Sequence, residues 1–136
     1  MIRVLIILLL AIASARAADP PKLPLTSAEQ AVSYFREARE NLLATLPEDR
    51  RKFVIFVSTT AHSLRVMRWS ADSNQHLRDD PSLRGDVVPI LGSIAAVEGS
   101  KTDTWSLYYN AGMTAFVVYL DAVSGKVLFL HSIPEG

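Results

Sequence analysis

The sequence predicts a single α+β domain, in which two helices cover one face of a twisted antiparallel sheet of about five strands. Apolar residues recur at helical spacing over residues 27–46. Three β-rich runs joined by short, glycine-containing turns fill the C-terminal part of the chain. The expected element order is α-β-β-α-β-β-β, and 136 residues are enough for one such domain.

The composition is that of a folded domain with a sizeable core. Hydrophobic residues make up 49% of the chain and charged residues 21%, which disfavours disorder. The formal net charge is zero, from 14 basic and 14 acidic residues. Because nucleic-acid-binding domains carry an excess of basic residues, we expect no nucleic-acid partner.

The N-terminus has the three parts of a secretory signal peptide. Arg3 supplies a positive start, Val4–Ala13 is an unbroken apolar run, and residues 15–17 read Ala-Arg-Ala, the small-x-small pattern for cleavage. The apolar run is shorter than the roughly 20 residues of a membrane-spanning helix. We therefore expect removal of residues 1–17, a mature chain that begins at Ala18, and a periplasmic or secreted protein without membrane attachment.

The mature chain is predicted to begin with a proline-rich leader followed by a helix. The leader, residues 18–25, is expected to be extended and mobile, and residues 26–136 to form the domain. Ser27 can cap a helix that we expect to span Ser27–Leu46, with Pro47 ending it. The apolar positions at helical spacing are Ala28, Ala31, Val32, Phe35, Ala38, Leu42, Leu43 and Leu46.

The middle of the chain predicts a hairpin, a loop and a second helix. Lys52–Thr60 is a continuous β-branched and aromatic run, and Ser63–Ser70 alternates imperfectly, so together they predict a β-hairpin. Residues 71–85 are polar and predict a long loop. Apolar residues at helical spacing then predict a helix over Val87–Glu98, with Gly99 as its C-cap.

The C-terminal part predicts three consecutive antiparallel strands. Their expected ranges are Thr104–Asn110, Thr114–Asp121 and Lys126–Ile133. Gly112 and Gly125 lie in the two connections, and we expect both to adopt the positive φ that tight hairpin turns often need.

The last hairpin carries a pattern of residues that spans its first strand, its turn and the start of its second strand. In FVVYLDAVSGKVLFLHS, residues 116–132, a strand ending in aromatic-x-Asp precedes a small-residue turn that ends in Gly-Lys and leads into Val-Leu. This pattern resembles the closing hairpin of PepSY-type domains, and the resemblance covers about residues 103–133. The matching residues are Tyr119, Asp121, Ser124, Gly125, Lys126, Val127 and Leu128. PepSY-like domains are small exported modules that bind or inhibit partners such as peptidases. The resemblance therefore implies a binding module, and it brings no catalytic residue with it.

Candidate nucleophiles are few. The chain has no Cys and no Gly-x-Ser-x-Gly motif. His62 follows Ser58 closely in the sequence, and Asp72 could complete a Ser-His-Asp triad, which geometry alone can establish. We expect no catalytic residue, and we keep a small exported hydrolase that uses His62 or His76 as an alternative.

The sequence also offers one candidate metal site. His76, Asp79 and Asp80 have the spacing of metal ligands on one face of a helix, but the following Pro81 disfavours a helix there. No phosphate loop or dinucleotide motif is present. We therefore expect neither a metal nor another cofactor.

The last three strands are apolar on both faces, whereas one layer of helices covers only one face. The other face must be covered within the chain, by a ligand, or by a protein, a peptide or a second copy. The predicted binding surface consists of Trp105, Tyr108, Tyr109, Tyr119 and His131. We expect a non-catalytic binding module that recognises a protein or peptide, or forms a homodimer, through this sheet. A small-molecule carrier with a pocket between helix and sheet is the other alternative.

Overall fold

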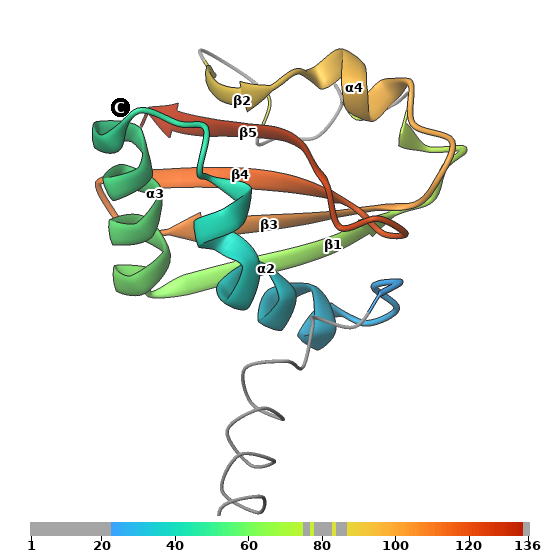
Figure 1. The fold of residues 1–136 in the computed structure, drawn as a ribbon, viewed down its shortest axis with the longest axis horizontal. Helices are drawn as coiled ribbons and strands as arrows, with labels where there is room; N and C mark the ends of the chain where they lie inside the picture. Colours follow the sequence, from blue (N-terminus) through green and yellow to red (C-terminus); the bar gives the residue numbers. More distant parts are fainter. Residues whose placement is uncertain (1–22, 75–76, 78–82, 84–86, 135–136) are drawn as a thin grey trace, which may run out of the picture.

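The computed structural model describes residues 23–74, 77, 83 and 87–134, so the predicted signal peptide lies outside the described residues. The elements, in chain order, are α2 (Ala28–Leu42), α3 (Glu48–Thr60), β1 (Ser63–Trp69), β2 (Val88–Gly92), α4 (Ile94–Glu98), β3 (Thr104–Asn110), β4 (Thr114–Asp121) and β5 (Val127–Pro134). The strands form one open antiparallel sheet in the order β1-β3-β4-β5-β2 (Figure 1). The predicted α+β class with a five-stranded antiparallel sheet is therefore confirmed.

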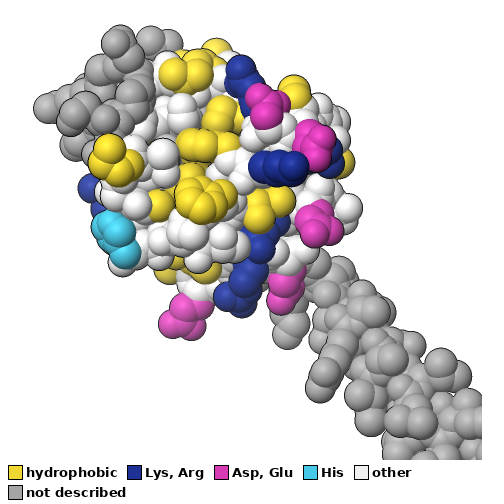
Figure 2. Space-filling model, turned by 90° about the vertical axis from the view of Figure 1, so that its left-hand side faces the viewer, with side chains coloured by type: hydrophobic (Ala, Val, Ile, Leu, Met, Phe, Trp, Pro, Cys, Tyr) yellow, Lys and Arg dark blue, Asp and Glu magenta, His cyan; other side chains and the backbone are white. Residues whose placement is uncertain are grey.

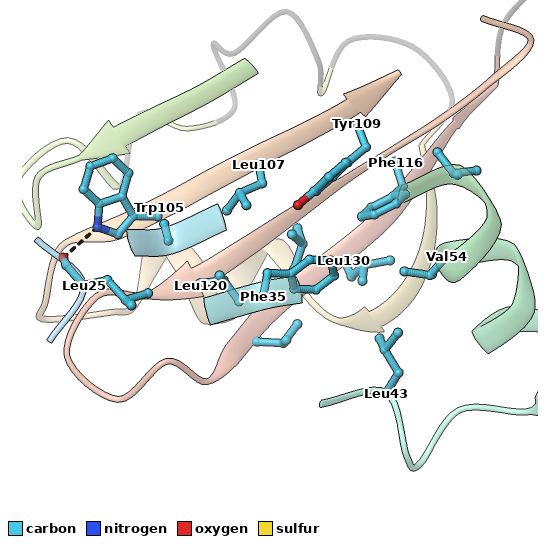
Figure 3. Close-up of a cluster of buried hydrophobic side chains, with 14 of the residues drawn as sticks. Leu25, Phe35, Leu43, Val54, Trp105, Leu107, Tyr109, Phe116, Leu120 and Leu130 are labelled. Carbon is cyan, nitrogen blue, oxygen red and sulfur yellow. Dashed lines mark hydrogen bonds between the residues drawn. The ribbon is translucent and has the colours of Figure 1, made fainter. Parts of the chain in front are cut away.

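Different elements cover the two faces of the sheet. Helices α2 and α3 lie on one face, which we call the helix face (Figure 1). Phe35 of α2 and Val54 of α3 are fully buried there, close to Phe116 of β4 (Figure 3). The opposite, outer face packs against α4 through the buried Val97 and against the buried Leu77. The sheet is therefore the middle layer of the domain, with apolar side chains on both sides.

Local capping explains where α2 begins. The Ser27 hydroxyl accepts a hydrogen bond from the Gln30 amide at 3.2 Å, and Gln30 Oε1 accepts one from the Thr26 amide at 2.9 Å. This is a capping box displaced by one residue. The predicted start of the helix is thus confirmed. Its predicted end at Leu46 is wrong, because the helix ends at Leu42 and a turn carries the buried Leu43 and Leu46 toward α3.

The last residue of the leader belongs to the core. Leu25 is almost fully buried, and its amide donates to the Ala122 carbonyl at 2.6 Å. Its carbonyl accepts a hydrogen bond of 2.8 Å from the indole nitrogen of Trp105 (Figure 3). The predicted mobile leader is therefore wrong at this position, because one backbone–backbone hydrogen bond and one from the Trp105 side chain hold Leu25 against the turn after β4 and against β3.

Residues 52–60 form the second part of helix α3 instead of the predicted strand. Val54 and Val57 are buried against the sheet, as their three-residue spacing allows in a helix, while Phe56 points away and is 59% exposed. On the flank that carries α3, exposed hydrophobic side chains lie beside charged ones (Figure 2). A continuous apolar run of this length suits a strand or a buried helix equally well. The predicted hairpin over residues 52–70 is therefore wrong, and β1 pairs with β3 instead.

The predicted helix over Val87–Glu98 is divided into strand β2 and the short helix α4. Gly92 has φ +70, and a Cβ at this position would clash with the Leu128 carbonyl of β5. This close approach ends β2. Ser93 then caps α4, and its hydroxyl accepts a hydrogen bond from the Ala96 amide at 3.2 Å. Only the helical second half and the C-cap at Gly99 are confirmed.

The three C-terminal strands match their predicted ranges to within one residue. Gly112 and Gly125 have φ values of +94 and +73, as predicted. Asp121 closes the last turn, where its Oδ1 accepts hydrogen bonds from the amides of Val123 and Ser124 at 2.8 and 2.9 Å. Local residues thus specify this hairpin.

Candidate functional site

On the helix face, the predicted binding residues are part of the core. Trp105 and Tyr109 are each only 6% exposed. The Tyr109 ring lies 5.8 Å from that of Phe35 and stacks on that of Phe116 at 4.9 Å (Figure 3). The prediction that this face contacts a partner is therefore wrong, because α2 and α3 already cover it.

On the outer face, two further predicted binding residues are fully buried. Tyr119 and His131 have no exposed surface, and the Phe129 ring lies 5.9 Å from the Tyr119 ring and 4.9 Å from the His131 ring. Tyr108 is half-buried, with the Arg65 guanidinium 5.2 Å from its ring centre. Of the five predicted residues, only Tyr108 is thus partly accessible.

An apolar pocket of about 370 Å³ opens on the outer face between β2, α4 and β5, and we call it the β2–α4 pocket. Its lining consists of Leu83, Val87, Pro89, Gly92, Ser93, Ile94 and Phe129. Phe129 is buried, whereas Pro89, Gly92 and Ser93 are exposed. The pocket therefore has an aromatic base and an accessible rim.

Local backbone geometry shapes this pocket. The positive φ of Gly92 turns the chain out of β2, and Ser93 starts α4 immediately afterwards. This turn places Ile94 across from Phe129, which is held in turn by its ring contacts with Tyr119 and His131. Strands β2 and β5 and helix α4 thus supply most of the pocket wall.

The chemistry of the pocket is that of an apolar binding site. None of its lining side chains is titratable, and the Ser93 hydroxyl already caps α4. The lining can bind a ligand by burying the ligand's apolar group away from water. Its volume lies at the lower end of the range of about 300–1,000 Å³ for small-ligand sites.

A second hollow, of about 490 Å³, lies between α2 and α3 and is more polar. Its lining consists of Glu40, Asn41, Leu43, Glu48, Arg51, Lys52 and Ile55. Lys52 and Glu48 form an exposed ion pair of 3.1 Å in its wall. Because acidic and basic groups are mixed there, the hollow has no clear charge preference, and the smaller apolar pocket is the better candidate site.

The proposed catalytic triad is not assembled. His62 precedes β1 and Asp72 follows it, and a seven-residue strand is about 23 Å long. The Ser58 hydroxyl donates to the Ile55 carbonyl at 2.9 Å and accepts a hydrogen bond from Arg39 at 3.0 Å. The possible Ser58–His62–Asp72 triad is therefore not formed, because strand β1 separates His62 from Asp72.

The candidate metal ligands His76, Asp79 and Asp80 lie outside the described residues. Within the described ranges, no group of three or more His, Cys, Asp or Glu side chains is arranged to hold a metal ion.

The pKa values of Asp103, Asp121 and Tyr109 are shifted by their surroundings. A hydrogen bond of 2.7 Å from Arg68, together with one from the Ala71 amide, holds the pKa of Asp103 below its usual value. Burial acts to raise the pKa of Asp121, but the hydrogen bonds that it accepts outweigh burial and lower it. Burial raises the pKa of Tyr109 to about 12.

Comparisons with protein-family models, curated proteins and solved structures found no match to this chain. Its class is therefore defined by its own geometry, as a small α+β domain with an apolar pocket on the outer face of an open antiparallel sheet. The resemblance to PepSY-type domains stays a prediction. No helix in the described part of the chain is both long and apolar enough to cross a membrane.

Sequence reasoning missed the pocket because it predicted one helix over the residues that form its rim. A signal was present in Pro89 and Gly92, both poor residues for a helix interior, and in Ser93, a good N-cap. Together they predict a break before Ile94. The contribution of Phe129 needed the pairing of β2 with β5, which joins distant segments.

Proposed function

We propose that this protein is a non-catalytic binding module that recognises a protein or peptide partner by taking an apolar side chain into the β2–α4 pocket. The observation that carries the proposal is the apolar pocket with a buried aromatic base and an exposed rim. The predicted signal peptide supports a role in the periplasm or outside the cell.

The energetics suit a partner side chain. Full burial of a Leu, Ile or Phe side chain contributes about 1.5–3 kcal/mol, and such anchors dominate many interfaces. Val88, on β2, is 46% exposed beside the exposed Pro89. The partner can therefore extend its contacts along β2 once its anchor occupies the pocket.

A small-molecule carrier is the second candidate function. The volume of the pocket favours it, because about 370 Å³ falls within the range of small-ligand sites. The two functions share one pocket, so they predict the same sensitive residues and differ in the ligand that remains bound during purification.

The test is binding of the neutral apolar fluorophore N-phenyl-1-naphthylamine to the mature chain. We expect Ile94→Glu, which places a charge in the pocket wall, to abolish the fluorescence gain. Ala96→Glu adds the same charge to the exposed side of α4 and should leave the gain unchanged. Melting temperatures establish that both variants fold. Equal fluorescence in the three folded proteins would exclude the pocket as the binding site.

The partner and carrier functions are then separated with two further measurements. Peptides selected from a random displayed library should share an aromatic or branched aliphatic anchor and lose affinity for Ile94→Glu. Native mass spectrometry of the purified wild-type chain should show no retained small molecule. A retained apolar compound, absent from Ile94→Glu, would favour the carrier instead.

A further inference from the structure

A positive charge lies next to the rim of the β2–α4 pocket. Arg50, in the first turn of α3, donates a hydrogen bond of 3.2 Å from its Nη1 to the Pro89 carbonyl. Pro89 itself lines the pocket. Arg50 also lines a smaller hollow of about 200 Å³, together with Val88 and Ile90 of β2. Strand β2 therefore separates the apolar pocket from a guanidinium group that is bonded to its edge.

The guanidinium group of Arg50 has further donors to offer. Its bond to Pro89 uses one of the five N–H groups of an arginine. Arg50 is exposed, and it forms no ion pair within the part of the chain that the structure describes. Because a guanidinium fork matches a carboxylate in both charge and geometry, the natural ligand for these donors is a carboxylate.

The edge of β2 is closed to an added strand at this position. Pro89 has no backbone N–H, and its carbonyl already accepts a hydrogen bond from Arg50. The register with β5 also shifts between Pro89 and Leu91. Strand addition needs a regular row of free donors and acceptors. A chain end that stops at the pocket rim therefore suits this edge better than a segment that runs past it.

We propose that the anchor of the partner is its C-terminal residue, whose apolar side chain enters the β2–α4 pocket while its terminal carboxylate binds Arg50. The side chain and the carboxylate of a terminal residue leave the same Cα, so they can contact the pocket and Arg50 on either side of Pro89. The residues before the chain end can then contact the exposed Val88. This inference deepens the proposed function and rests on it, because it names the partner's chemistry: a protein chain that ends in a large apolar residue.

The test is an NMR titration of the mature chain with three acetylated peptides. The first is Ser-Gly-Ser-Gly-Ser-Phe with a free carboxylate, and the second is the same peptide with a terminal amide. The third, Ser-Gly-Phe-Glu-Ser-Gly-amide, places the anchor and a carboxylate inside the chain. We expect the second and third peptides to bind about threefold to fivefold more weakly than the first, as loss of an exposed ion pair predicts. The side-chain Nε–H signal of Arg50 should shift with the first peptide and not with the second.

Protein variants locate the charge that binds the carboxylate. Arg50→Gln should abolish the difference in affinity between the first two peptides, because the guanidinium charge is removed. Arg36→Gln, an equal charge change on the exposed side of α2, should preserve that difference. Asp49→Asn removes a carboxylate that lines the same small hollow as Arg50, so it should strengthen binding of the first peptide by about twofold. Melting temperatures establish that the three variants fold.

Four results would overturn the proposal. They are equal affinity of the wild-type chain for the first two peptides, binding of the third peptide as tight as that of the first, and no binding of any peptide at millimolar concentration. The fourth is tighter binding of octanoate than of the first peptide, which would assign the site to a fatty acid.

Failure of this proposal can be distinguished from failure of the proposed function. Equal affinity for the acid and amide peptides, lost for both in Ile94→Glu, would leave the pocket as an apolar binding site without a role for Arg50. Equal fluorophore binding by wild type and Ile94→Glu would instead exclude the pocket itself.

Discussion

Replacing Gly125 by alanine tests how the last hairpin is locked to α2. Gly125 has φ +73, which costs a residue with a Cβ about 1–2 kcal/mol. A Cβ there would also clash with the phenol ring of Tyr34. Overpacking of a well-packed core typically costs about 1–3 kcal/mol. Here the displaced group is the outer end of the half-buried Tyr34 side chain, so we expect the lower end of that range. We therefore expect Gly125→Ala to lower the free energy of unfolding by about 2–3 kcal/mol.

Gly112 offers a matched control. Its φ is +94, but a Cβ there would meet only His62 Nε2, at an ordinary contact distance of 3.5 Å. Gly112→Ala should thus cost only the backbone strain, about 1–2 kcal/mol. Any gain from restricting the unfolded chain is similar for both variants. The difference between them therefore isolates the contact with Tyr34.

Urea unfolding, followed by circular dichroism, measures these free energies. Tyr34→Ala should remove the extra cost, so that Gly125→Ala destabilises the Tyr34→Ala protein by no more than Gly112→Ala destabilises the wild type. If both glycine variants cost the same in the wild type, or if Tyr34→Ala gives no relief, the proposed packing of Tyr34 on Gly125 is refuted.

Three further predictions concern the pocket and pH. Gly92→Ala should reduce both stability and fluorophore binding, because its Cβ would clash with the Leu128 carbonyl; unchanged binding would contradict the described turn. The pKa of Asp103 is lowered in the folded state, so its carboxylate stabilises the fold at pH values above its ordinary pKa of 3.8. This contribution is lost as the pH falls through the lower pKa of the folded state. Urea unfolding across this range should show a smaller acid-induced loss for Asp103→Asn than for the wild type. Tyr109 has a pKa raised to about 12, so its contribution is complete below pH 10 and is lost between pH 10 and 12. Alkaline unfolding of Tyr109→Phe should lack this loss.

The binding residues illustrate the limit of sequence reasoning about function. The pattern indicated correctly that both faces of the C-terminal strands are apolar, and both faces are buried. It could not indicate that α2 and α3 cover one face while α4 and Leu77 pack on the other. The same aromatic residue types serve as interface anchors and as core residues. Only the fold therefore shows which of these side chains are exposed.

The sequence by itself was sufficient to predict those parts of the structure that neighbouring residues specify. Ser27 and Gln30 set the start of α2, and Asp121 with Gly125 sets the turn between β4 and β5. These interactions join residues at most four positions apart, so their pattern is visible in the chain. The α+β class and the three C-terminal strands followed from such signals.

Only the tertiary structure decided the rest. The apolar run of α3 could be buried as a strand or as a helix, and packing of Val54 and Val57 against the sheet selected the helix. The segment at Val87–Glu98 was divided because β2 pairs with β5, some 40 residues further along the chain. Such choices depend on which distant surface a segment buries, and local propensity is too weak to decide between them.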